Sequence, residues 1–135
     1  MKSNNQKLIP FLTFHGNAEE AINFYASILP NAKIDSLVRF EKDQGGDEGK
    51  VMNGILSFSG QQIMFMDMAK SADLPSFSWT TSLYLNCKDE AEFDTIFDGL
   101  SKKGSVMMGP EPVAHFRKVA WVTDKFGVTW QPVLE

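Results

Sequence analysis

The chain has 135 residues, of which 43% are hydrophobic and 22% charged, and this composition is ordinary for one globular domain. Its net charge of −4 argues against nucleic acid or an anionic membrane as a partner, because both select clustered Lys and Arg. The N-terminus is polar over residues 1–6, and no apolar run approaches the roughly 18 residues of a membrane span. We therefore expect a cytoplasmic protein.

The first elements in chain order are a strand and a helix. Residues 8–14 (LIPFLTF) form an apolar run of strand length, and Pro10 within it indicates an edge or a sheet end. Asn17 is predicted to cap a helix, and from Ala21 the apolar residues recur at i, i+3, i+4 and i+7. Pro30, with Asn31 after it, is expected to end this helix.

Three further strands are predicted in the first half. Residues 33–42 alternate as a strand, and the Gly-rich, charged residues 43–50 should form an exposed loop. Residues 51–58 and 61–68 then predict a hairpin around Ser59-Gly60.

The second half repeats this order after a polar connection over residues 69–78, which is the best candidate boundary between the halves. Gly104 is expected to close the second helix by adopting the left-handed conformation. The expected elements are a strand over 80–86, a helix opened by Asp89 and Glu90, a short strand over 105–108, a loop over 109–112, and strands over 113–123 and 128–134.

The repeated order predicts an α+β fold. It consists of two βαβββ repeats, about 7–68 and 79–135, within a single domain over residues 1–135. A four-stranded sheet with one helix leaves its other face bare. Two such units can curve their mixed sheets together and enclose a cup.

Two segments carry a resemblance to a known superfamily. Residues 17–25 (NAEEAINFY) and 124–131 (DKFGVTWQ), in this layout, resemble the vicinal oxygen chelate superfamily, which includes glyoxalases and bleomycin-binding proteins. The opening residues 9–12 (IPFL) and the closing Trp130-Gln131 are similar to its PhnB-like branch, which often carries the label 3-demethylubiquinone-9 3-methyltransferase. The resemblance implies a homodimer, because cups in this superfamily are commonly completed across pairs of units.

The resemblance also implies where a metal would bind. Metal-using members place four His, Glu or Gln ligands in the cup, and the corresponding positions here are Pro10, Met64, Ser82 and Gln131. A slip of one residue at any of them still brings in no His, Asp, Glu or Cys. A divalent metal needs several hard or imidazole ligands. We therefore expect no metal and no other cofactor, and the metal chemistry of the glyoxalases and dioxygenases is not expected to carry over to this chain.

Other reactive side chains have simpler interpretations. His15 and His115 are candidate general bases, but a surface turn and a strand edge are the expected positions. Cys87 is the only cysteine, so no internal disulfide forms. The adjacent Lys88 would lower the pKa of its thiol, whereas a lone cysteine is usually a small buried hydrophobe. Asp67 is expected at a turn or in solvent.

The cup is predicted to be apolar, with few polar groups. Such a cleft suits a small apolar or aromatic molecule, although ordinary core and dimer interface explain the same residues equally well. Gln131 is the expected polar anchor, and Trp130 should point to the opposite face and pack under a helix. The predicted ligand-binding residues are Met64, Met66, Trp79, Ser82, Tyr84, Trp121 and Gln131.

Three functions remain open from the sequence. The preferred hypothesis is a metal-free small-molecule binding protein of the glyoxalase/bleomycin-resistance type, with an unknown ligand. The first alternative is a metal-independent enzyme of the same superfamily: a lyase, an isomerase or the labelled methyltransferase. The turn after the first strand, His15-Gly16-Asn17, has one glycine, unlike the Gly-rich turn of most adenosylmethionine enzymes. The second alternative is a dimeric interaction protein without ligand.

Overall fold

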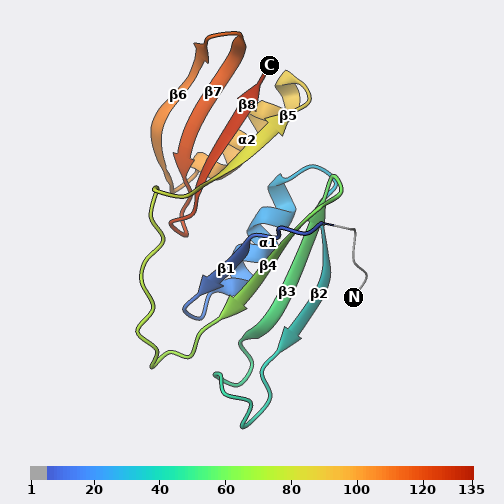
Figure 1. Ribbon diagram of the computed structural model, residues 1–135, viewed down its shortest axis with the longest axis vertical. Coiled ribbons are helices and arrows are strands. Elements are labelled where there is room, and N and C mark those ends of the chain that lie inside the picture. Colours follow the sequence, from blue (N-terminus) through green and yellow to red (C-terminus); the bar gives the residue numbers. More distant parts are fainter. Residues whose placement is uncertain (1–5) are drawn as a thin grey trace. The chain divides into compact units, whose positions relative to one another are not determined.

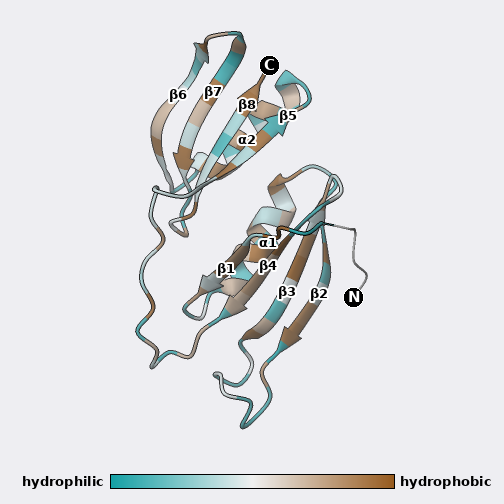
Figure 2. Ribbon diagram, in the orientation of Figure 1, coloured by the Kyte–Doolittle hydropathy of each residue, from teal (hydrophilic) through white to brown (hydrophobic). Residues whose placement is uncertain are grey.

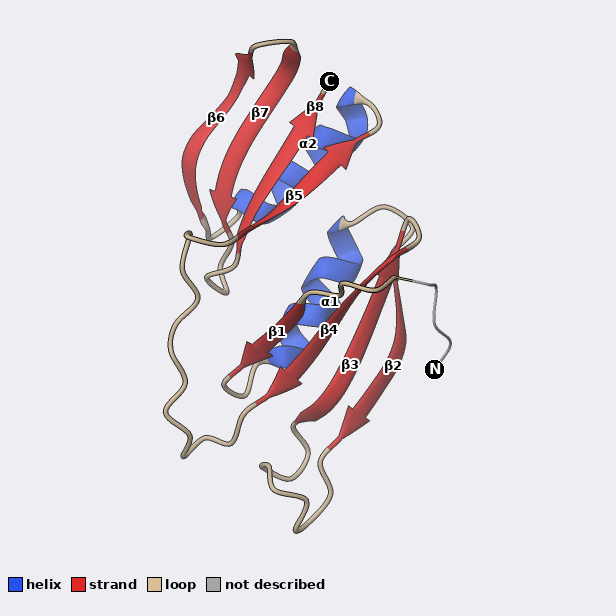
Figure 3. Cartoon of the chain, viewed as in Figure 1, coloured by secondary structure: helices blue, strands red, loops and turns tan. Residues whose placement is uncertain are grey.

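The computed structural model describes residues 6–135, so most of the polar N-terminal segment lies outside the described residues. The chain divides into two compact units, and the boundary in the sequence falls between Leu74 and Pro75. Each unit carries one helix and a four-stranded mixed sheet (Figures 1 and 3). The predicted α+β class and the order of elements in each repeat are confirmed. No helix within residues 6–135 is both long and apolar enough to span a membrane.

The first unit has the strand order β1-β4-β3-β2. β1 pairs with β4 in parallel, whereas β3 is antiparallel to both β4 and β2. The connection between β2 and β3 is exposed and largely hydrophilic, as predicted (Figure 2). The elements are β1 (Phe11–Phe14), α1 (Ala18–Ile28), β2 (Lys33–Arg39), β3 (Val51–Phe58) and β4 (Gln61–Asp67).

The core of the first unit lies between α1 and one face of this sheet. The ring of Phe65 lies 5.9 Å from both the Phe14 ring and the Tyr25 ring, measured between centroids, and all three side chains are buried. Gly54 lets the helix approach closely, because a Cβ there would come within 3.2 Å of the Ile22 side chain.

The start of α1 differs from the prediction. Asn17 makes no side-chain capping bond. Instead, the carboxylate of Asp67 accepts hydrogen bonds from the Gly16 and Ala18 amides, both at 2.9 Å, and from the Val51 amide at 2.9 Å. Asp67 is only 1% exposed, so the expectation of a solvent residue was wrong. An acceptor on β4 replaces the local cap and joins the helix start to two strands.

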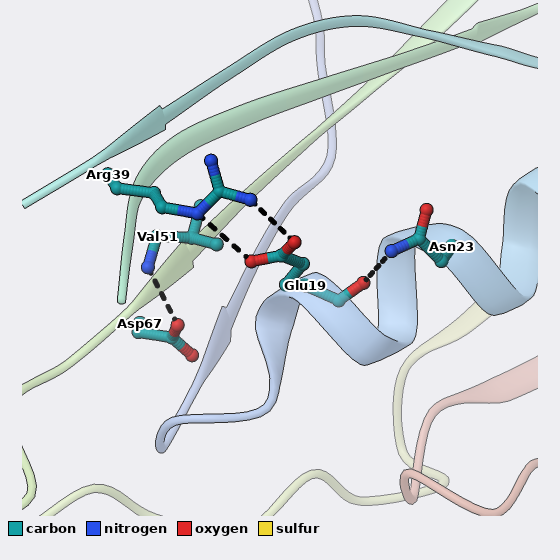
Figure 4. A network of polar contacts seen from close by, with 5 residues as sticks. All are labelled: Glu19, Asn23, Arg39, Val51 and Asp67. Carbon is teal, nitrogen blue, oxygen red and sulfur yellow. Dashed lines mark hydrogen bonds and ion pairs between the residues drawn. The ribbon is translucent and has the colours of Figure 1, made fainter. Parts of the chain in front are cut away.

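A second polar contact holds α1 to the edge strand β2. Glu19, in the first turn of the helix, accepts two hydrogen bonds from the Arg39 guanidinium, the shorter at 2.6 Å (Figure 4). Both side chains are about half exposed, so this pair contributes little to stability. It does place the Arg39 side chain on the helix-covered face of the sheet.

The second unit has the strand order β5-β8-β7-β6. β5 pairs with β8 in parallel, and β7 is antiparallel to β8 and β6. The elements are β5 (Ser82–Cys87), α2 (Glu90–Ser101), β6 (Ser105–Val113), β7 (Phe116–Thr123) and β8 (Thr129–Leu134).

The ends of α2 follow local chemistry. Asp89 caps the helix by accepting a hydrogen bond from the Glu92 amide at 2.9 Å, and the Glu92 carboxylate accepts one from the Lys88 amide at 3.0 Å. At the other end the left-handed residue is Lys103, with φ 60°, and not Gly104 as expected. Gly104 is required for a different reason, because a Cβ there would lie 2.5 Å from the Thr123 carbonyl oxygen.

The predicted loop over residues 109–112 was also wrong, because β6 continues through it to Val113. β6 is an edge strand, and its pairing with β7 shifts register between Met108 and Glu111. Edge strands and bulges tolerate proline, since not every backbone amide there is needed for the ladder. The Gly- and Pro-rich residues 109–112 can therefore form part of a strand at this edge of the sheet.

Candidate binding site

The two faces of the second sheet are distinguished by α2. The Lys118 ammonium contacts Glu90 and Asp94 of α2, both at 2.9 Å, so Lys118 lies on the helix-covered face. Lys118 is the register partner of Leu134. Because side chains alternate along a strand, Leu134 and Trp130 share this covered face and Gln131 points to the other.

Trp130 is fixed on the covered face as predicted. It is 1% exposed, and its indole N–H donates to the Asp124 carboxylate at 2.9 Å. The other Asp124 oxygen accepts from the amides of Phe126 and Val128, at 2.8 and 3.2 Å. The Asp124 carboxylate therefore stabilises the turn before β8 and holds the Trp130 side chain on the covered face. An Asp at the start of the Asp-Lys-Phe-Gly segment is a known turn signal, but the contact of Asp124 with the Trp130 indole could not be predicted from the sequence.

The opposite face of the second sheet, named here the open face, brings together four of the predicted binding residues. Tyr84 is the register partner of Gln131, and Ser82 is the partner of Thr129 on the same strand pair. Thr123 pairs with Thr129, which places Trp121 on this face by alternation. The residues of the open face are Ser82, Tyr84, Asn86, Val119, Trp121, Thr123, Thr129, Gln131 and Val133.

Trp79, the fifth predicted residue in this unit, lies beside the open face. Its ring meets the Trp121 ring edge to face, with centroids 5.6 Å apart and an interplanar angle of 83°. Trp79 is 59% exposed and Tyr84 is 53% exposed. Both therefore present large aromatic surface that the fold itself does not bury.

The nine residues named above are neutral and offer a small number of polar groups, whereas Arg117 on β7 and Glu111, the register partner of Val119 on β6, add charges at the margin of this face. The Thr123 hydroxyl lies 2.8 Å from the Thr129 hydroxyl and 3.2 Å from the Met107 sulfur. The side chain of Gln131 is partly exposed and makes no hydrogen bond to any residue that the structure describes. The indole nitrogen of Trp121 is buried and has no partner within residues 6–135.

Met64 and Met66 lie on the corresponding face of the first sheet. Phe65 between them packs against Tyr25 of α1, so alternation directs both methionines to the face without the helix. Met64 is the register partner of Phe11, which is 48% exposed. The prediction that the two methionines alternate onto one face of the hairpin is confirmed, whereas their contact with a ligand stays a prediction.

The residues at the four expected ligand positions do not fit a divalent metal. Pro10 precedes β1, and its carbonyl oxygen accepts a hydrogen bond from the Met64 amide at 2.9 Å. Ser82 and Gln131 offer a hydroxyl and an amide, and Met64 offers a thioether. Nowhere in the described part of the chain do three His, Cys, Asp or Glu side chains cluster at metal-binding distance. The absence of a bound metal stays a prediction.

The other reactive side chains occupy structural or exposed positions. Cys87 is buried at the end of β5, and burial raises the pKa of its thiol to about 11, with a further contribution from Glu92. The activating effect expected from Lys88 is therefore absent. The Nε2 atom of His15 lies 3.0 Å from the Ala69 carbonyl oxygen. His115 is exposed between β6 and β7, 3.2 Å from the Glu135 carboxylate.

Comparison with known proteins places the chain in a family. The family model described as 3-demethylubiquinone-9 3-methyltransferase matches residues 6–133. The PhnB protein of Bacillus cereus is 37% identical, with a TM-score of 0.85, over 96% of this chain and 100% of that chain. Protein YjdN of Escherichia coli K12 is 27% identical over 91% of each chain.

A more distant structure shows the same fold. The glyoxylase/bleomycin resistance protein/dioxygenase domain from Frankia sp. EAN1pec is 17% identical, with a TM-score of 0.65, over 98% of this chain and 93% of that chain. The suspected resemblance is therefore confirmed. This chain belongs to the 3-demethylubiquinone-9 3-methyltransferase family and has the fold of glyoxalase/bleomycin-resistance proteins.

Proposed function

We propose that this protein binds a small, neutral, partly apolar molecule and acts through that binding without a metal. The observation that carries the proposal is the open face of the second sheet. Ser82, Tyr84 and Gln131 lie on adjacent parallel strands there, and none of the nearby side chains on this face is charged. Small-molecule sites are mostly apolar surfaces with a few placed polar groups.

Gln131 is the polar anchor in this proposal. Its amide offers both a donor and an acceptor, and no described residue already uses them. It therefore suits a ligand that carries a carbonyl, amide or hydroxyl group, and we expect it to bind a cation only weakly. On the first sheet, considered by itself, Met64 and Met66 offer adaptable apolar surface on the helix-free face.

Methyl transfer, which the family description names, is not part of the proposal. A cofactor bound at the turn after β1 would need backbone amides at the start of α1. The amides of Gly16 and Ala18 already donate to the Asp67 carboxylate, at 2.9 Å each. Adding adenosylmethionine to the binding assay below tests this directly, and saturable binding at micromolar concentration would favour the enzyme.

The proposal is tested on protein purified without a tag. Native mass spectrometry should detect a co-purifying molecule of low mass, and thermal melts against a library of neutral aromatic compounds should give stabilising hits. Gln131→Leu should leave the melting temperature of the unliganded protein nearly unchanged and weaken binding by about 1–3 kcal/mol, because a buried ligand group loses its partner.

Gln61→Leu is the matched control, because Gln61 is an exposed glutamine at the start of β4. It should bind every hit like the wild type. If Gln131→Leu also binds like the wild type, Gln131 is not the anchor. If no co-purifying molecule and no hit is found, the binding function itself is wrong.

A further inference from the structure

We propose that the ligand is an aromatic molecule with an uncharged acceptor oxygen, and that this oxygen accepts a hydrogen bond from the indole N–H of Trp121. The inference rests on the proposed function and specifies the ligand class. It assigns to Trp121 a polar role in addition to the apolar surface that its ring provides.

The first observation is the unpaired donor. The Trp121 nitrogen is buried, yet no acceptor lies within reach among residues 6–135. A buried N–H without a partner destabilises the fold, and such groups are rare in native proteins. Trp130 in the same unit shows the ordinary arrangement, because its N–H donates to Asp124 at 2.9 Å. The Trp121 N–H on the open face thus lacks a hydrogen-bond acceptor within residues 6–135, whereas the Trp130 N–H on the covered face has one.

The second observation is the aromatic neighbour. Trp79 packs edge to face against Trp121, although Trp79 is 59% exposed and lies in the connection between β4 and β5. Edge-to-face packing of two rings is a weak interaction, so an incoming ring can replace the Trp79 ring at small cost. A ligand ring that displaces Trp79 would keep the aromatic contact with Trp121 and bring an acceptor to its N–H.

The third observation is the absence of charge next to Trp121. The side chains next to Trp121 are Val119 and Thr123 on β7, its neighbours on β8 and its register partner Met108 on β6, all neutral, and the charged Glu111 is the partner of Val119. An anionic acceptor would lose its hydration and find no cation there, which is costly. A carbonyl or ether oxygen meets the same N–H with a smaller desolvation cost. The geometry therefore favours a neutral aromatic carbonyl compound over an aromatic acid.

The test uses two probes of nearly equal shape, 1-indanone and indane, of which only the first has a carbonyl. The chain has three tryptophans, so a ¹⁵N–¹H spectrum resolves three indole cross-peaks. They are assigned with the single variants Trp79→Phe, Trp121→Phe and Trp130→Phe. Titration with 1-indanone should shift the Trp121 proton downfield and leave Trp130 unmoved. Indane should produce no downfield shift at Trp121.

The affinities supply a second readout. Trp121→Phe should weaken 1-indanone binding about five- to tenfold more than it weakens indane binding, a difference that corresponds to one neutral hydrogen bond. Trp79→Phe is the matched control and should keep the preference for the carbonyl probe.

Each other outcome overturns the proposal. If 1-indanone binds and shifts other signals of the open face but not Trp121, the hydrogen bond is wrong while the binding function stands. If the wild type binds the two probes with equal affinity, the hydrogen bond from Trp121 is likewise wrong while the binding function stands. If neither probe binds at millimolar concentration, the ligand class is wrong. If the Trp121 signal moves on dilution of the protein alone, a second copy of the chain supplies the acceptor.

Discussion

At the scale of single residues, two buried carboxylates organise the two units. Asp67 gathers three backbone amides from the turn before α1, from α1 and from β3, and Asp124 gathers two amides and an indole. Each is at most 3% exposed. A buried carboxylate is costly unless it is fully hydrogen-bonded, so these sites are stable only when all of these donors are in place. Asp124 matters to the candidate site because it fixes the alternation that directs Gln131 to the open face.

Asp67→Ala should therefore lower the free energy of unfolding by about 3 kcal/mol, because several buried amides lose their acceptor together. Urea denaturation followed by circular dichroism measures this. Asp47→Ala is the control, because Asp47 also accepts a backbone hydrogen bond, from Lys70, but in an exposed loop. It should cost less than about 1 kcal/mol. Equal losses in the two variants would show that Asp67 does not organise the first unit.

At the scale of elements, the features that depend on a local sequence pattern could be predicted from the sequence. The hairpin around Ser59-Gly60 is present, with φ of 48° and 77° at these two residues, as a tight two-residue turn requires. The faces of β4 and β8 also followed from simple alternation, which is why Gln131 and the two methionines were placed on the helix-free faces. Strand pairing beyond neighbouring strands was not visible in the pattern.

The errors arose where a distant contact replaces a local one. Asp67 accepts from amides that lie 51 and 49 residues away along the chain, so no local motif could show that it would replace Asn17 as the cap. Only residues 109–112 of β6 were assigned as a loop, because they contain Gly109-Pro110 and Pro112, whereas the edge position of the strand tolerates both prolines. The polar character of the open face, including the unpaired Trp121 nitrogen, likewise depends on packing and not on sequence.

Gly109 provides the test at this scale. It has φ of 81°, and a Cβ there would lie 2.1 Å from the Val119 carbonyl oxygen, so β6 must move away from β7 in Gly109→Ala. Gly45→Ala is the control that measures the cost of the backbone conformation alone, because Gly45 has φ of 88° and nothing lies within 4 Å of the added carbon. We expect Gly45→Ala to cost about 1 kcal/mol and Gly109→Ala at least about 2 kcal/mol more, by chemical denaturation. Similar costs at both sites would contradict the β6–β7 register.

At the scale of the whole molecule, the central prediction beyond the single chain is a homodimer. Edge strands with apolar side chains need cover, and on β6 both Val106 and Met107 are exposed. Light scattering coupled to size exclusion should give twice the 15.1 kDa mass of the chain at micromolar concentration. A monomer under these conditions would contradict the dimer, and with it any site shared between two copies.

The proposed function requires that a small molecule binds at the open face of the second sheet. The most direct measurement is a set of intermolecular nuclear Overhauser effects from 1-indanone to assigned side-chain protons. We expect contacts to the Tyr84 ring and to the Gln131 side chain, which are register partners on the open face, and none to Leu134 on the covered face. Contacts confined to Leu134 and α2, or to the loop over residues 43–50, would contradict it.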